Sequence, residues 1–144
     1  MSFVLDNKEM VDSFFEDVRL LGIQASIKDY NFCWQINQLM GIDFRVTNVV
    51  EIPLLRKGRT YYFPVYEYGQ PSTCLMHYLY NNQHDGEYLL PELRHLDFLW
   101  LLKDDYVADE LLSDMIYSLR SLNGVQLVVE LTSEKIKSRE NLVF

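Results

Sequence analysis

Two carboxylates and a histidine lie close together in the middle of the sequence. Glu92 and Asp97 bracket His95, and carboxylates near a histidine can exchange protons at neutral pH. A structural role accounts for the same residues, because Glu92 can accept from loop N–H groups or pair with Arg94, and Asp97 can pair with a buried partner. We favour this structural role. The alternative is a small-ligand site or a minor enzymatic activity near Glu92, His95 and Asp97, which requires a pocket on which the three side chains converge.

The other histidines give no pattern that is typical of a metal site. His77, His84 and His95 lack the close paired spacing of most metal ligands in short sequences, although Asp85 is nearby. The sequence also has no glycine-rich phosphate loop and no nucleophile elbow. We therefore expect no catalytic residue, no metal and no cofactor, and we favour a protein that is not an enzyme.

Tyrosines give the best positive indication of a function. The chain has ten of them, and a tyrosine combines an apolar body with a polar tip, which suits contacts between proteins. In a predicted hairpin, Tyr62, Tyr66 and Tyr68 share one face of the first strand. Tyr78 and Tyr80 share a face of the second strand. These rings form either a patch for a protein partner or a cover over the sheet beneath the helices.

The last three residues are a second unusual feature, because chain ends are mostly polar. Leu142, Val143 and Phe144 follow a charged stretch at 135–141. We expect this apolar tip to pack on the protein's own core or on another subunit. Phe144 therefore joins the five tyrosines in the candidate interaction surface.

The elements that would position these residues follow from hydrophobic periodicity and turn signals. The predicted strands are a buried one within 14–25, and 42–52, 60–68, 72–80, 96–102 and 125–131. The predicted helices are 27–40 and 107–122. The most hydrophobic short run, 96–102, is expected to be a central strand covered on both faces. The segments 60–68 and 72–80 are expected to pair as a hairpin around Gly69, Gln70 and Pro71.

The helix 27–40 carries the most specific local signals. Ser26 and Asp29 have the spacing of a capping box, and Gly41 supplies a left-handed stop. The predicted buried stripe consists of Ile27, Tyr30, Cys33, Trp34, Asn37 and Met40. The polar group of Lys28, Asp29, Tyr30 and Asn37 indicates either helix capping with a core hydrogen bond or a polar pocket.

Prolines and a glycine mark the ends of the predicted strands. Pro53 should close the strand 42–52, because proline cannot donate to the ladder. Residues 56–59 read as a turn, and Pro64 argues for an edge or bulged position. The sequence thus predicts a single α+β domain over 1–144. Two main helices would pack on one face of a mostly antiparallel sheet, in a two-layer, ferredoxin-like arrangement with an added hairpin.

Composition restricts the classes of partner. The chain of 144 residues has a formal net charge of −8, which repels phosphate backbones and disfavours nucleic acid. No run approaches the roughly 18 apolar residues of a spanning helix, and the first residues do not resemble a signal peptide. We therefore expect a cytoplasmic protein without membrane contact, in which Cys33 and Cys74 are buried thiols.

One segment resembles the signature of a bacterial family, the IPExxxVDY family. Pro91, Glu92 and Asp97 match the signature identically. Leu90, Leu96 and Phe98 stand where the signature has Ile, Val and Tyr, so the hydroxyl of the last position is absent here. The segments 21–37 and 135–144 also resemble the family, and the resemblance covers essentially the whole chain. It implies a small protein of Bacteroidota-type bacteria and brings no activity with it.

These observations lead to one hypothesis about function. We expect a non-enzymatic cytoplasmic protein that acts as a protein interaction or adaptor module and forms a homodimer or binds another protein.

Overall fold

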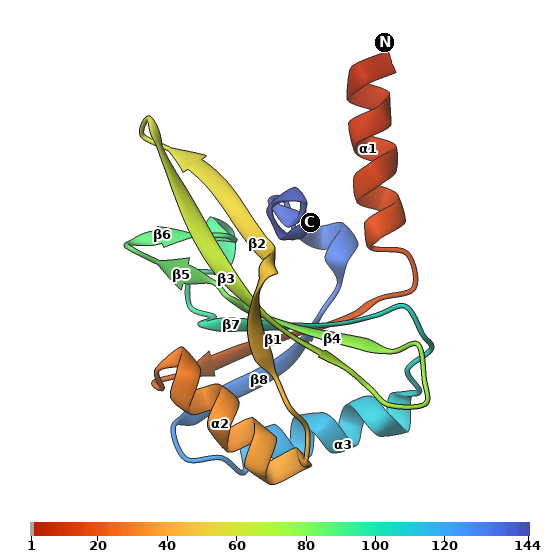
Figure 1. Cartoon of the computed structure of the whole chain (residues 1–144), viewed down its shortest axis with the longest axis vertical. Helices are drawn as coiled ribbons and strands as arrows, with labels where there is room; N and C mark the ends of the chain where they lie inside the picture. Colours follow the sequence, from red (N-terminus) through yellow and green to blue (C-terminus); the bar gives the residue numbers. More distant parts are fainter. Residues whose placement is uncertain (1) are drawn as a thin grey trace.

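A computed structural model describes residues 2–144, with side chains described for residues 7–46 and 50–144. It shows an α+β fold built on a six-stranded sheet with the strand order β2-β3-β4-β7-β1-β8 (Figure 1). Every neighbouring pair in this sheet is antiparallel. The expectation of an α+β fold with a mostly antiparallel sheet is confirmed.

The strands of this sheet agree with most of the predicted ones. Their bounds are β1 Arg19–Ala25, β2 Arg45–Arg56, β3 Arg59–Gly69, β4 Met76–Asn81, β7 Phe98–Lys103 and β8 Val125–Leu131. A separate small ribbon is formed by β5 (Gln83–His84) and β6 (Glu87–Tyr88). The run 96–102 does provide the central strand, because β7 lies between β4 and β1 and residues 98–102 are all buried.

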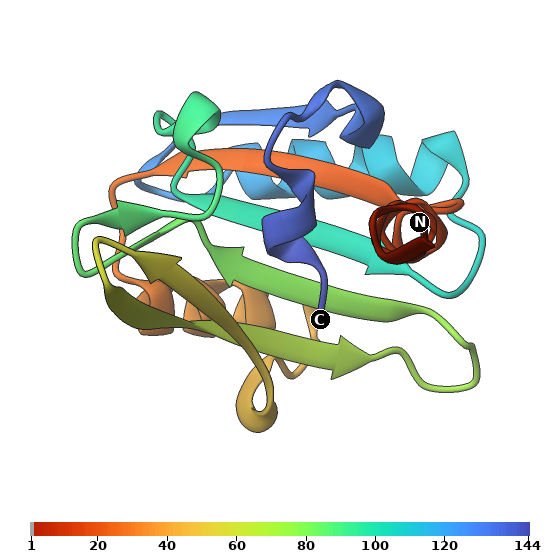
Figure 2. The same cartoon turned by 90° about the horizontal axis from the view of Figure 1, so that it is seen from above.

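Both faces of the sheet are covered. On one face lie the helices α2 (Asp29–Met40) and α3 (Asp109–Arg120), which bury Phe32, Ile36 and Leu112 against Trp100. The other face is covered by the end of α1 (Ser2–Phe14), the segment 89–96 and the C-terminal segment (Figure 2). The packing of two main helices on one face was predicted, but the cover on the second face was not.

The C-terminal tip packs on the protein's own core. The ring of Phe144 meets that of Phe14 edge-on at 5.2 Å and that of Tyr78 at 4.8 Å. The phenol of Tyr80 donates to the carbonyl of Leu142 at 2.8 Å in a buried hydrogen bond. The apolar tip was expected to pack either on the protein's own core or on another subunit, and in the structure it packs on the protein's own core.

The helix α1 was missed by the sequence reading, and the strand predicted within 14–25 begins later than its apolar run. Phe14 is the last residue of α1, and β1 begins at Arg19. Val11, Phe14 and Phe15 pack on the core. The rest of α1 projects from the body of the protein (Figure 1). The apolar run thus joins the packed end of a helix to a strand.

The helix α2 begins later and faces differently than predicted. Its N-cap is Lys28 without a side-chain cap, and Ser26 instead accepts from Gln126. The residues that it buries are Phe32, Cys33 and Ile36. Of the predicted stripe only Cys33 is buried, and the helix therefore points other aromatic residues at solvent. Its predicted end is confirmed, because Gly41 has φ 65° and its N–H donates to the carbonyl of Asn37.

Two prolines in the β2–β3 hairpin have different outcomes. Pro53 does not close β2 but lies inside it, opposite Tyr62. This is tolerated because β2 is an outermost strand and one missing donor disturbs no inner ladder. Pro64 lies next to a shift of register between β2 and β3, as a bulged position predicts, although β3 is not an edge. The predicted turn is confirmed by Lys57 and Gly58, which both have positive φ, as a tight hairpin turn requires.

The opposite outermost strand is protected by a side chain. Arg120 of α3 donates to the carbonyl of Val128 in β8 at 3.0 Å. Pro53 leaves a gap in the donors of β2, and Arg120 occupies an acceptor of β8. Both are devices that discourage pairing of a sheet edge with another chain.

Asn82 fixes the segment that connects β4 to β7. Its side chain is fully buried, its Nδ2 donates to the carbonyls of Leu93 and Leu96, and its Oδ1 accepts from the N–H of Leu90 at 2.8 Å. Its backbone N–H donates to the carbonyl of Asp97, and its carbonyl accepts from Leu89. One amide side chain thus binds three backbone groups outside the strands, of which the carbonyl of Leu93 also accepts from the N–H of Leu96.

We predict that Asn82→Ala lowers the free energy of unfolding by about 3 kcal/mol, because it removes the partner of two buried backbone groups, the carbonyl of Leu96 and the N–H of Leu90. Urea denaturation followed by circular dichroism measures the effect. The control is Asn31→Ala at an exposed position of α2, for which we expect a change within about 0.5 kcal/mol. Equal stability of the two variants would contradict the role assigned to Asn82.

Candidate functional site

The three residues of the proposed acid–base site do not converge. Glu92 is exposed and accepts from the backbone N–H of Ser138 at 2.8 Å. Asp97 accepts from the N–H of Ala25 at 2.8 Å, and His95 is exposed. Asp97 lines a pocket in which neither Glu92 nor His95 takes part. The carboxylates act as anchors for backbone N–H groups, which is the structural alternative that the sequence left open.

Hydrogen bonds to backbone groups also set the ionisation of Glu92. Partial burial alone would raise the pKa of this carboxyl, but backbone N–H donors, including that of Ser138, outweigh burial and lower it. Glu92 is therefore a carboxylate at neutral pH and cannot act as a general acid there. It holds the start of the C-terminal segment against the segment 91–93, a 3₁₀ turn that begins at Pro91.

Three of the six residues that match or replace the family-like signature are part of the core. Leu90 and Leu96 are almost completely buried, and Phe98 is 4% exposed. The ring of Phe98 stacks on that of Phe32 with 4.5 Å between centroids. The signature thus sets how the chain enters the central strand, and it exposes no cluster of reactive groups.

The five tyrosines of the expected patch lie on two different faces. Tyr66 is the register partner of Leu79 and Tyr68 that of His77, so these two rings lie on the α2 side of the sheet. Tyr78 and Tyr80 lie on the opposite side and are 8% and 0% exposed. Tyr62 is 55% exposed farther along the hairpin, and Phe144 is 43% exposed at the other face. The structure therefore does not bring these residues together as one surface.

A polar group at the start of α2 joins three elements. The carboxylate of Asp29 accepts from the phenol of Tyr66 at 2.9 Å and from Nδ2 of Asn81 at 3.0 Å. Burial alone would raise the pKa of Asp29, but the hydrogen bonds from Asn81 and Tyr66 outweigh it and lower that pKa. This network ties α2 to β3 and β4, which is why the single charged residue of α2 turns toward the sheet.

The pocket beside this network has a volume of about 410 Å³ and contains side chains of both signs. Lys28, Asp29, His84 and Asp97 are among its lining residues. The Oδ1 of Asn81 is buried and has no hydrogen-bond partner within the described residues. Asn37, the other polar residue of α2, binds the backbone of Phe44 from both ends of its amide. The sequence had left helix capping with a core hydrogen bond and a polar pocket as alternatives, and the structure has part-buried hydrogen bonds next to a pocket.

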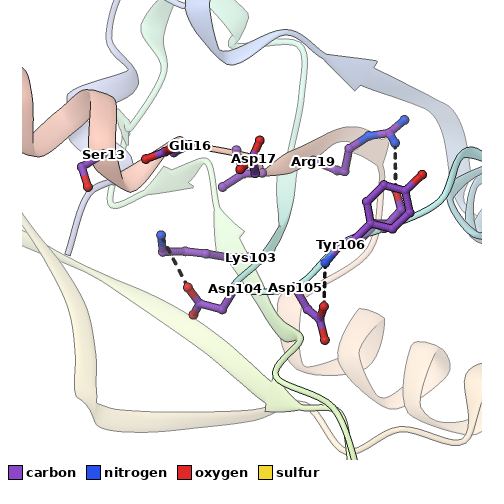
Figure 3. Close-up of a pocket in the computed structure, with 10 residues that line it drawn as sticks. Ser13, Glu16, Asp17, Arg19, Lys103, Asp104, Asp105 and Tyr106 are labelled. Atoms are coloured by element: carbon purple, nitrogen blue, oxygen red, sulfur yellow. Dashed lines mark hydrogen bonds and ion pairs between the residues drawn. The ribbon is translucent and has the colours of Figure 1, made fainter.

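A larger pocket of about 870 Å³ opens between the segments that precede β1 and follow β7. Figure 3 shows Glu16 and Asp17 entering from the α1 side and Asp104 and Asp105 from the end of β7. The Nζ of Lys103 donates to the carbonyl of Phe14 at 2.8 Å.

Arg19, the other basic residue of this pocket, is also engaged. It binds Glu130 at 2.7 Å and Asp109 at 2.9 Å. Among the carboxylates of the pocket, Asp104 lies 3.8 Å from the Nζ of Lys103, and Asp105 accepts from the N–H groups of Cys74 and Tyr106. Both basic groups and two of the carboxylates of this pocket are therefore engaged within the protein.

Metal binding finds no support in the arrangement of ligand-type residues. Across the described part of the chain, no three residues of the types His, Cys, Asp and Glu are grouped so as to hold a metal ion. Cys33 is buried, and burial raises the pKa of its thiol to about 12, so it is a neutral apolar side chain. Cys74 was expected to be buried in a strand, but it is exposed in the turn before β4.

His77 is a structural residue in the core. It is 4% exposed, its Nδ1 accepts from the indole N–H of Trp100 at 3.1 Å, and its Nε2 lies 3.2 Å from Oε1 of Gln70. These contacts fit a neutral ring that carries its proton on Nε2. Burial lowers the pKa of His77 to about 4. The histidine is therefore uncharged throughout the physiological range.

We predict that His77 makes stability depend on pH. Its pKa is lower in the folded protein than the usual value of about 6.5, so unfolding takes up a proton between these two values. The contribution of His77 to the free energy of unfolding is therefore fully present above about pH 6.5, and it is lost as the pH is lowered toward 4. Between pH 7 and pH 5 we expect a loss of about 2 kcal/mol in urea titrations.

His77→Gln, which keeps polar contacts but does not titrate, should be less stable at pH 7 and should lose much less between pH 7 and pH 5. His84→Gln serves as the control, because His84 is only half-buried in the β5–β6 ribbon. A slope in His77→Gln as steep as in the natural protein would refute this assignment.

The outer face of α2 is the least expected surface of the protein. Tyr30 and Trp34 were predicted to be buried, yet they are 69% and 61% exposed. With Gln38 they form a line of residues spaced four apart, which follows one face of a helix. Asn31 and Leu39 are exposed beside this line. We call these five residues the α2 outer face.

Charged side chains are absent from the α2 outer face. Asp29 is the one charged residue among the 12 of α2, and its carboxylate is held by Tyr66 and Asn81 on the sheet side. The exposed side of α3 is different, because Glu110 and Asp114 accompany the exposed Tyr117 there. Exposed aromatic side chains without charges are typical of the central part of protein interfaces.

Comparisons with known proteins add no functional information. Neither the protein-family models nor the curated proteins compared with this chain gave a match. Among residues 2–144, the structure contains no helix of the length and apolar character needed to span a membrane.

Proposed function

We propose that this protein is a protein interaction or adaptor module rather than an enzyme, and that it binds through the α2 outer face. One observation carries the proposal: Tyr30 and Trp34 are largely exposed on a helix face without charged groups. Exposing two large aromatic side chains to water is costly, whereas tyrosine and tryptophan are the residues most enriched among those that dominate binding energy.

The proposal keeps the function expected from the sequence but moves the contact surface. Tyr78 and Tyr80 are buried and Phe144 packs on the core, so the hairpin and the C-terminal tip supply less exposed aromatic surface than α2. The alternative of a small-ligand site or minor enzyme loses its basis, because Glu92 and His95 are not lining residues of the pocket that contains Asp97.

We further propose that the core of the fold is a ferredoxin-like arrangement with β2 and β3 added at one edge. The strand order β8-β1-β7-β4 supports this, with α3 as the crossover from β7 to β8 on either side of β1. Membership of the IPExxxVDY family is proposed on the residues 90–98. A reducing compartment, the cytoplasm, fits the two free thiols of Cys33 and Cys74.

We predict that the double variant Tyr30→Ala, Trp34→Ala loses its protein partners. Affinity purification of the tagged full chain from its native cells, with quantitative mass spectrometry, should show at least a tenfold loss, which corresponds to about 1.4 kcal/mol. Because both side chains are exposed, the free energy of unfolding should change little.

The matched control is Tyr117→Ala, which removes an 80% exposed tyrosine from a charged helix face. It should recover the same partners as the natural chain. If the double variant and the control recover partners equally, the α2 outer face is not the contact surface. If the natural chain recovers no partner of any kind, itself included, the proposed function fails.

A further inference from the structure

The net charge of −8 makes most encounters between two copies of this chain unfavourable. The outer side of α3 carries Glu110 and Asp114, and the large pocket carries Glu16, Asp17 and further carboxylates. Two copies that met at either place would bring like charges together, which costs free energy and is avoided at interfaces. The α2 outer face is uncharged, so two copies can approach there without this cost.

From this we propose that the α2 outer face binds the same face of a second copy, as an antiparallel helix pair around a two-fold axis. The inference rests on the proposed function and names the partner for the same surface. A two-fold interface must be self-complementary, since each residue meets a symmetry-related copy of the patch. Carboxylates and ammonium groups fail this condition because each repels its own copy.

The polar groups of the α2 outer face meet the condition. A phenol hydroxyl and a side-chain amide each donate and accept hydrogen bonds, so Tyr30, Asn31 and Gln38 can pair with groups of their own kind. Trp34 lies midway between Tyr30 and Gln38 in the line of exposed residues. An axis that passes near Trp34 places the indole rings of the two copies against each other. It also places Tyr30 of each copy opposite Gln38 of the other.

Pairing of the sheets edge to edge is a less favourable way to dimerise. Pro53 interrupts the donors of β2, and Arg120 occupies the carbonyl of Val128 in β8. A helix pair of this length is also small, because 12 residues of α2 span about 18 Å. Small interfaces are typical of weak and transient complexes, so we expect an association that depends on protein concentration.

Sedimentation velocity over a concentration series of the full chain tests the proposal. The expected result is a shift from monomer to dimer as the concentration rises. Trp34→Glu, which places two like charges at the axis, should abolish the shift. Tyr117→Glu adds the same charge to the 80% exposed site on α3 and should leave the shift unchanged. A monomer at all concentrations, or equal behaviour of both variants, overturns the proposal.

Cysteine cross-linking tests the register of the helix pair. In a Cys74→Ser background, Tyr30→Cys chains are mixed with differently tagged Gln38→Cys chains and oxidised. Disulfides should form between the two kinds of chain and at least tenfold less within Gln38→Cys chains alone. Efficient cross-linking of Gln38→Cys to itself, or none in the mixture, excludes an antiparallel pair centred on Trp34.

The two proposals can fail separately. If the chain is monomeric throughout, but the double variant of Tyr30 and Trp34 still loses partners in cells, then self-association is wrong and the interaction function stands. If the dimer is absent and the double variant retains every partner of the natural chain, both proposals are wrong.

Tryptophan fluorescence gives an independent measurement of self-association, because Trp34 is 61% exposed and Trp100 is fully buried. A blue shift with rising concentration should come from Trp34 alone.

Discussion

The structure depends on the hydrogen bonds that Asn82 and Asp97 make around the entry to β7. The backbone N–H of Asn82 donates to the carbonyl of Asp97, the N–H of Asp97 donates to the carbonyl of Ile23, and its carboxylate accepts from Ala25. These contacts join the end of β4, the start of β7 and the end of β1. Because a shift of one residue would turn every side chain of a strand to the other face, they fix which residues of β7 point to each core.

The two cores on either side of β7 explain why the fold needs this constraint. Leu99 and Leu101 face the cluster under α1 and the C-terminal segment, whereas Phe98, Trp100 and Leu102 face the helices. The chain buries apolar groups on both sides of β7, and the hydrogen bonds of Asn82 and Asp97 lie where the chain enters this strand. Asn82 and Asp97 thus serve to hold β7 in register. Tyr30 and Trp34, which are exposed on α2, take no part in either core.

Much of the architecture could be predicted from the sequence, because its signals are local. The glycine-containing run at 56–59 lies between two strand-like segments, and the run at 96–102 is apolar enough to predict burial. Asn82 could not be distinguished in the same way, because it stands in a polar run beside Asn81 and its role arises from carbonyls that only the fold brings close. The buried face of α2 was predicted wrongly because its sequence contains two apolar stripes at helical spacing, one with Tyr30 and Trp34 and one with Phe32 and Ile36. Phe32 and Ile36 fill the space over Trp100, and choosing them leaves Tyr30 and Trp34 outside.

The position of β1 has a consequence for how the chain is made. This strand leaves the ribosome before both of its neighbours in the sheet, which are β7, whose last residue is Lys103, and β8, which ends at Leu131. The strands β2, β3 and β4 follow one another and can pair as they emerge. The apolar segment around Leu21 and Ile23 therefore stays unpaired until β7 has been synthesised. For this protein, nascent chains that stall before β7 emerges carry an unpaired β1, which a chaperone would have to hold.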